Sequence, residues 1–153
     1  MSAPIVKAEM LIRKPVGDVF KAFVDPAVTT HFWFSKSSGK LEPGKRVRWD
    51  WEMYGVGDDI DVKAIEANQC IVFEWSFPNS NLVEMAFRPH AKGTIVSITN
   101  SGLRGEDVIA LALDLTQGWN LVLAAAKGWL EHGIELNIVA DKAPDHNIEG
   151  WDK

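Results

Sequence analysis

The sequence predicts an α+β fold: a curved antiparallel β-sheet wrapped around a long C-terminal α-helix, with two short helices after the first strand. Between residues 106 and 133, apolar residues recur every three or four positions, as they do on the buried face of a helix. Between residues 45 and 101, apolar and polar residues alternate instead, in segments separated by short turns. Such a series is typical of an antiparallel meander, and the long helix would cover its apolar face.

The N-terminal segment predicts a strand followed by two short helices. Residues 5–13 alternate as a strand does. Pro15 suits the first turn of a helix that runs to Val24, because the missing N–H costs nothing there. Asp25-Pro26 ends this helix, and a second short helix is predicted over residues 26–32.

Further strands are predicted over residues 45–53, 59–66, 69–77, 82–88 and 93–101, after a linker at residues 37–39. Alternation determines which side chains of a strand share one face of the sheet. The side chains predicted to share a face are Val47, Trp49, Trp51 and Met53; Ile60, Val62 and Ala64; Ile71, Phe73, Trp75 and Phe77; and Val83, Met85 and Phe87.

The long helix is predicted over residues 106–133, with Gly133 as its C-terminal stop. Gly118 lies inside it and permits a kink or two helices in tandem. The buried stripe is predicted to contain Val108, Ala112, Leu115, Trp119, Val122, Ala126 and Trp129. We expect one domain over residues 1–135 and an irregular tail over residues 136–153.

Composition narrows the classes of function. A chain of 153 residues with 46% apolar content fits one globular domain. The net charge of −5 argues against nucleic acid and anionic membranes as partners, because both attract basic surfaces. We expect no membrane span and no signal peptide, and the single cysteine suits a reducing compartment, so a cytoplasmic location is predicted.

Four stretches in series resemble the START-like helix-grip (SRPBCC) superfamily, in the branch homologous to the C-terminal domain of the activator of heat shock protein 90 ATPase. They are PVGDVFKAFVDPAVTTHFW (15–33), IEANQCIVFEW (65–75), GTIVSITNSGL (93–103) and GWNLVLAAAKGWLEHG (118–133). The resemblance implies the helix-grip fold. Its members range over hydrophobic-ligand binding, polyketide cyclisation and chaperone regulation, so the function must be argued from the site.

The chain departs from this family at two places. Relatives often carry a histidine shortly before the Gly-Trp pair, where this chain has Leu115, Thr116 and Gln117. Another histidine is common just before Ser-Gly-Leu, where this chain has Asn100. Both replacements remove acid–base groups that the resemblance would place near a cavity.

The sequence predicts no catalytic residue, metal site or cofactor. None of the four histidines lies at metal-ligand spacing from another histidine, a cysteine or a glutamate. Cys70 has no basic neighbour in sequence, and alternation points Glu74 away from the face that carries Trp75. Enzymatic activity is therefore left open, with binding favoured over catalysis.

Seven tryptophans point to a candidate ligand cavity between the sheet and the long helix, although they could also serve only as core. An aromatic wall with few polar groups is what an apolar ligand requires. The predicted ligand-binding residues are Trp33, Phe34, Trp49, Trp51, Trp75, Phe77, Met85, Phe87, Trp119 and Val122.

Three functions remain open from the sequence. The first is binding of a small hydrophobic or aromatic molecule in this cavity. The second, implied by the resemblance, is regulation of a heat shock protein 90-type chaperone ATPase as a protein partner. The third is a cyclase or hydrolase that uses the same cavity. A homodimer is also left open.

Overall fold

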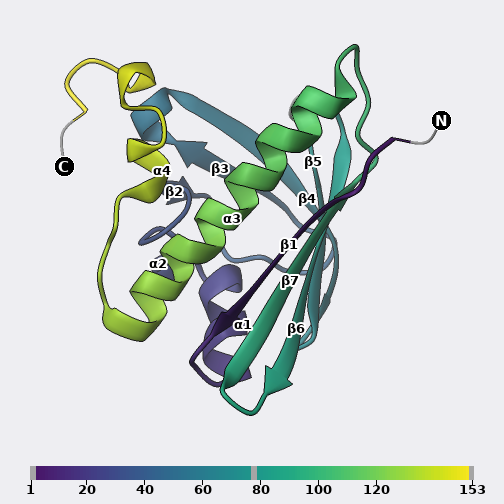
Figure 1. Cartoon of the computed structure of the whole chain (residues 1–153), viewed down its shortest axis with the longest axis vertical. Helices are drawn as coiled ribbons and strands as arrows, with labels where there is room; N and C mark the ends of the chain where they lie inside the picture. Colours follow the sequence, from purple (N-terminus) through teal and green to yellow (C-terminus); the bar gives the residue numbers. More distant parts are fainter. Residues whose placement is uncertain (1–2, 77–78, 152–153) are drawn as a thin grey trace.

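The computed structural model describes residues 3–76 and 79–151 and shows an antiparallel sheet curved around one long helix (Figure 1). The seven strands follow the order β1-β7-β6-β5-β4-β3-β2. This arrangement confirms the predicted α+β class. The elements are β1 (Val6–Ile12), α1 (Val16–Val24), α2 (Pro26–Thr29), β2 (Lys36–Ser37), β3 (Arg46–Trp51), η1 (Glu52–Tyr54), β4 (Val56–Glu66), β5 (Cys70–Trp75), β6 (Asn81–His90), β7 (Gly93–Ser101), α3 (Val108–His132), α4 (Ile138–Asp141) and η2 (Pro144–His146).

The two short helices differ slightly from the prediction. α1 begins after Pro15 as expected and buries Val19 and Phe23. α2 ends at Thr29 instead of residue 32, and turns follow it. The Asp25 carboxylate accepts a hydrogen bond of 3.0 Å from the backbone N–H of Ala27, and this caps α2 at its first turn.

Strand β4 corrects the sequence prediction in its length and in its alternation. It begins at Val56 and pairs with β5, and the register shifts between Val62 and Ala64. Because an extra residue at a bulge reverses the alternation beyond it, Ala64 is exposed and Ile65 packs against the core. The prediction that Ala64 shares a face with Ile60 and Val62 was therefore wrong. The predicted linker at residues 37–39 also contributes part of a short strand, β2, which pairs with β3.

Helix α3 is one continuous element of 25 residues, without a break at Gly118. The Asp107 side chain caps its first turn by accepting from the N–H of Ala110, and Gly133 ends it in the left-handed conformation, with φ 64°. Its fully buried side chains lie on one face: Ala112, Trp119, Val122, Leu123, Ala125 and Ala126. Val108, Leu115 and Trp129 of the predicted stripe are partly buried against the same core.

By length and composition alone α3 is apolar enough to cross a membrane, contrary to our expectation that no segment approaches such a span. The core helix of a soluble protein meets the same criterion. Here the buried face of α3 packs on the concave side of the sheet (Figure 1).

Near its C-terminal end, α3 binds backbone groups at the end of β1, the edge strand beside β7. The Lys127 ammonium donates to the carbonyl oxygen of Leu11 at 2.9 Å. The backbone N–H of Arg13 donates to the Glu131 carboxylate at 2.8 Å. Lys127 and Glu131 also form an ion pair with each other. One helix turn thus supplies both an acceptor and a donor to the edge of the sheet.

After Gly133 the chain turns back along α3 and packs beside η1, forming α4 and η2 (Figure 1). The Tyr54 hydroxyl donates to the carbonyl oxygens of Val139 at 2.5 Å and of Ala140 at 3.1 Å. The N–H of Ile148 donates to the carbonyl oxygen of Met53 at 2.8 Å. These bonds attach the tail to the segment that joins β3 and β4.

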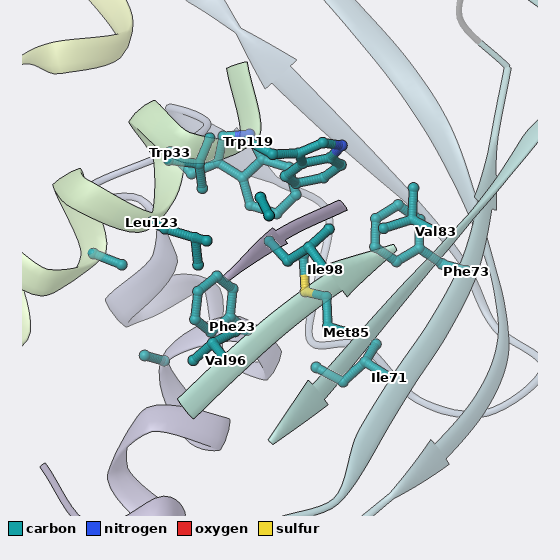
Figure 2. Packing of buried hydrophobic residues seen from close by; sticks show 14 of the residues in the cluster. Phe23, Trp33, Ile71, Phe73, Val83, Met85, Val96, Ile98, Trp119 and Leu123 are labelled. Atoms are coloured by element: carbon teal, nitrogen blue, oxygen red, sulfur yellow. The ribbon is translucent and has the colours of Figure 1, made fainter. Parts of the chain in front are cut away.

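The core between sheet and helix has two ends (Figure 2). One end lies against α1, where Phe87 contacts Phe20 and Phe23 with ring centres 5.3 and 5.8 Å apart. At the other end Trp33 and Trp119 lie against each other, with ring centres 5.3 Å apart. The tryptophans of the predicted site gather at this second end.

Candidate functional site

A cavity of about 430 Å³ opens at the tryptophan-rich end of the core, between α3 and the tail. This volume lies within the usual range for small-molecule sites. Its wall comes from three parts of the chain. They are α3 (Asp114, Leu115, Gly118, Trp119, Leu121 and Val122), the strand ends and loops of the sheet (Trp33, Trp51, Tyr54 and Trp75), and the tail (Val139, Lys142 and Ala143).

The tryptophan rings form a continuous wall. Trp75 and Trp119 stack with ring centres 5.2 Å apart and an interplanar angle of 20°. Trp33 packs edge-on to Trp119 at 5.3 Å and to Trp51 at 6.3 Å. Because the rings contact one another, each limits the rotation of its neighbours. The apolar surface of this wall is therefore formed before any ligand arrives.

Two buried asparagines lie behind the stacked pair and bind its indole N–H groups. Trp75 Nε1–H donates to Asn81 Oδ1 at 2.6 Å, and Trp119 Nε1–H donates to Asn100 Oδ1 at 3.2 Å. Asn100 Nδ2 in turn donates to Asn81 Oδ1 at 2.7 Å. The two indole donors are thus satisfied within the protein, which matters because an unpaired buried donor is costly.

The charged groups of the cavity lie at its rim, and the Tyr54 hydroxyl is its other titratable group. Asp114 on α3 and Lys142 on the tail are both exposed and line the opening. The Tyr54 hydroxyl is bound to tail carbonyl oxygens, and burial, aided by the charge of Asp141, holds the pKa of Tyr54 above its ordinary value. Tyr54 therefore remains a neutral donor at neutral pH.

The structure brings five of the predicted ligand-binding residues to the cavity wall: Trp33, Trp51, Trp75, Trp119 and Val122. Trp49 lies deeper, stacked on Phe34 at 4.6 Å and edge-on to Phe73 at 5.3 Å. Trp49 is only 1% exposed.

The remaining predicted residues lie elsewhere. Met85 and Phe87 are buried in the core, and Phe87 packs at its α1 end. Phe34 lines a second cavity, described below. Phe77 lies outside the residues that the structure describes. The use of the predicted set as ligand contacts remains a prediction.

Sequence reasoning missed several wall residues. Gly118 stands out in the sequence, because a glycine inside a long helix lowers the stability of that helix. The prediction connected it with a possible kink and not with a cavity wall. A Cβ added at Gly118 would meet no heavy atom within 4 Å, because this position faces the cavity. Val139 and Lys142 had no signal, because the irregular tail shows no periodicity that would place it against the sheet.

A second cavity of about 230 Å³ lies between residues 30–35 and the tail. At its edge His31 Nδ1 and the Glu135 carboxylate are 2.6 Å apart. The His31 ring also stacks on Trp129, with ring centres 3.9 Å apart. These contacts join the turn after α2 to α3 and the tail. Within residues 3–76 and 79–151, no group of three histidine, cysteine or acidic side chains could hold a metal ion.

One protein-family model matches most of the chain. A family model described as "Activator of Hsp90 ATPase homolog 1-like protein" matches residues 13–131. The chain belongs to this family. The match confirms the resemblance seen in the sequence. The family assignment and the fold make the chain a helix-grip domain of the ligand-binding type, and they do not specify a ligand.

Solved structures agree with this family assignment. The crystal structure of SSP2350 from Staphylococcus saprophyticus is 32% identical, with a TM-score of 0.79, over 87% of this chain and 96% of that one. DynU16, from the dynemicin biosynthetic locus, is 24% identical with a TM-score of 0.74, over 86% of this chain and 48% of that one. The Aha1 dimer from Colwellia psychrerythraea is 18% identical with a TM-score of 0.74, over 85% of this chain and 98% of that one. The last two likenesses show the fold alone. No curated protein matches the chain.

The family match ends at residue 131, one residue before the last residue of α3, His132. The tail that supplies Val139, Lys142 and Ala143 to the cavity therefore lies outside the residues that the family model matches.

Proposed function

We propose that this protein binds a small apolar or aromatic molecule in the cavity between the sheet and α3. The observation that carries the proposal is the wall of four tryptophans around a space of about 430 Å³. Apolar contact area is the main source of affinity in such sites, and stacked or edge-on rings add specificity for aromatic ligands. The body of the ligand would lie against Trp33, Trp75 and Trp119.

Gly118 supports this proposal independently. A glycine inside an exposed helix costs about 1 kcal/mol relative to alanine. Neither a break in the helix nor a close backbone approach accounts for it, because α3 is continuous and a Cβ here would meet nothing within 4 Å. The missing side chain instead enlarges the cavity at the middle of the helix.

The alternative functions draw less support from the site. A cyclase or hydrolase would need an acid–base pair near the bound molecule. The titratable side chains among the described wall residues are those of Tyr54, Asp114 and Lys142; Tyr54 is bound to the tail, and the other two are exposed at the rim. Regulation of a chaperone ATPase rests on the family description, and a cytoplasmic location remains a prediction.

The proposal can be tested by filling the cavity from the helix. Gly118→Leu places a side chain into the open space, and it should not lower stability, since leucine favours helices more than glycine. Gln117→Leu adds the same side chain at the neighbouring, exposed position and serves as the matched control. Each protein is titrated with an anilinonaphthalene sulfonate and followed by probe emission and tryptophan quenching.

We expect saturable binding to the wild type and to Gln117→Leu, and at least about tenfold weaker binding to Gly118→Leu, as loss of most contact area implies. Because such dyes also bind partly unfolded protein, urea unfolding of all three must show intact folds. Equal binding by the three folded proteins, or no saturable binding by the wild type, would exclude this cavity as the site.

A further inference from the structure

The rim of the cavity carries one acid and one base, on two different elements of the chain. Asp114 projects from α3, and Lys142 from the end of α4 in the tail. They are the charged members of the described cavity wall. Across residues 3–76 and 79–151, neither side chain forms an ion pair, with each other or with any other group. Both charges are therefore available to a bound molecule.

The deeper wall offers no such charged group. The indole N–H groups of Trp75 and Trp119 are already bound to Asn81 and Asn100. The Tyr54 hydroxyl donates to tail carbonyl oxygens. A polar atom buried against these side chains would lose its hydration without gaining those donors in return. The cavity therefore favours a ligand that is apolar at its inner end and polar at its outer end.

We propose that the ligand carries a zwitterionic head group on an aromatic or other apolar body. Its cationic group lies at Asp114 and its anionic group at Lys142. This inference rests on the proposed function, because it names the chemical class of the molecule in the same cavity.

A head group with both signs fits the rim better than a head group with one. A cationic head group is attracted by Asp114 and repelled by Lys142. An anionic head group is attracted by Lys142 and repelled by Asp114. Only a head group with both charges gains from both rim residues. Because Lys142 lies beyond the family match at residue 131, this selectivity would come from the tail of this chain.

A matched series of ligands tests the head group with the body held constant. Naphthylalanine is zwitterionic, naphthylethylamine cationic, naphthylpropanoate anionic and ethylnaphthalene neutral. Their affinities are measured by calorimetry for the full chain at neutral pH and low salt. We expect naphthylalanine to bind about threefold or more tightly than either singly charged analogue, as exposed charge pairs allow. The preference should shrink at high salt.

Charge-removing variants assign each end of the head group. Asp114→Asn should weaken the binding of naphthylalanine and naphthylethylamine, because it removes an attraction to their cationic groups. It should strengthen the binding of naphthylpropanoate, because it removes a repulsion of the carboxylate. Lys142→Gln should weaken the binding of naphthylalanine and naphthylpropanoate and strengthen the binding of naphthylethylamine. Glu84→Gln and Lys92→Gln are the controls, because these exposed residues of the sheet and its β6–β7 turn line neither cavity, and they should leave all four affinities unchanged.

The outcomes separate this inference from the proposed function. Suppose that ethylnaphthalene binds, but that naphthylalanine binds no more tightly than naphthylethylamine or naphthylpropanoate. The zwitterion assignment is then overturned, and the apolar site stands. Rim variants that affect all ligands alike would overturn it as well. If none of the four compounds binds the folded wild type, the proposed function fails and the inference fails with it.

Discussion

The Asn100 side chain accepts a hydrogen bond of 3.2 Å from the indole N–H of Trp119, and both residues are buried. Asn100 also donates to Asn81 Oδ1 at 2.7 Å and to the carbonyl oxygen of Leu82 at 2.9 Å. A fully bonded amide of this kind fixes the orientation of its partners, because rotation would break several buried bonds together. Asn100 thus joins β6, β7 and α3 at the back of the cavity.

Replacing Asn100 with alanine should lower the free energy of unfolding by about 2–3 kcal/mol, because the Trp119 indole N–H is left buried without its acceptor. Urea unfolding measures the loss. Asn120→Ala is the control, since Asn120 is exposed on α3 and bonds only within its own helix. A similar loss for both variants would contradict the claim that the buried network stabilises the fold more than an exposed hydrogen bond does.

Trp119→Ala should lower the free energy of unfolding by about 3–5 kcal/mol, as large-to-small changes in packed interiors do. Trp119 is 3% exposed, stacks on Trp75 and binds Asn100, so its cavity-facing surface is a minor part of the ring. Trp51→Ala should cost less, because Trp51 is only partly buried. The two losses are compared by urea unfolding, and a larger loss for Trp51 would contradict this packing.

Gly118→Ala should raise the free energy of unfolding by up to about 1 kcal/mol, since alanine favours helices and its methyl group meets no neighbour. Gly128→Ala on the same helix is the matched comparison. Its Cβ would lie 2.6 Å from Leu136 Cδ1 of the tail, which must move. Urea unfolding should show a gain at position 118 and a smaller gain or a loss at position 128.

Glu131→Gln should destabilise the protein in a pH-dependent way. Burial raises the pKa of Glu131, but hydrogen bonds from Lys127 and from the N–H of Arg13 outweigh it, so the pKa lies below its ordinary value. A depressed pKa in the folded state means that the ionised form stabilises the fold at neutral pH. This contribution is lost as pH falls below the unfolded-state value of about 4.3 and through the folded-state pKa.

We therefore expect Glu131→Gln to cost about 1–2 kcal/mol at pH 7, and the difference from wild type to shrink as the solution is acidified below about pH 4. Urea unfolding of both proteins across this range measures the effect. Glu106→Gln, at an exposed position outside the helix, is the control. A difference that stays constant with pH would contradict the assigned ionisation.

Alternation and helical periodicity were sufficient to predict most of this fold. They placed Val47, Phe73 and Met85 in the core and the stripe of α3 against the sheet. They failed at Ala64, because a bulge reverses the alternation and leaves no local mark in the sequence. The alternation of side chains between the two faces of a strand depends only on local geometry, so it is a reliable guide wherever the strand pairing is regular.

The site was predicted less completely, because alternation along a strand tells which face a side chain occupies and not how far below the protein surface it lies. Trp49 and Trp51 share a face, yet Trp49 is packed in the core and Trp51 reaches the cavity. The tail residues were missed because their position depends on long-range contacts such as that between Tyr54 and Val139. Such contacts leave no pattern in a single sequence.

The attachment of α3 to β1 has a consequence for how copies of this protein meet at high concentration. An edge strand with free backbone groups can pair with another chain and start aggregation. Here Lys127 and Glu131 occupy backbone groups at Leu11 and Arg13, near one edge of the sheet. The strand at the other edge, β2, has only two residues, too few to template a partner. Growth of the sheet from molecule to molecule is thereby discouraged at both edges, so crowded molecules should meet through side-chain surfaces instead.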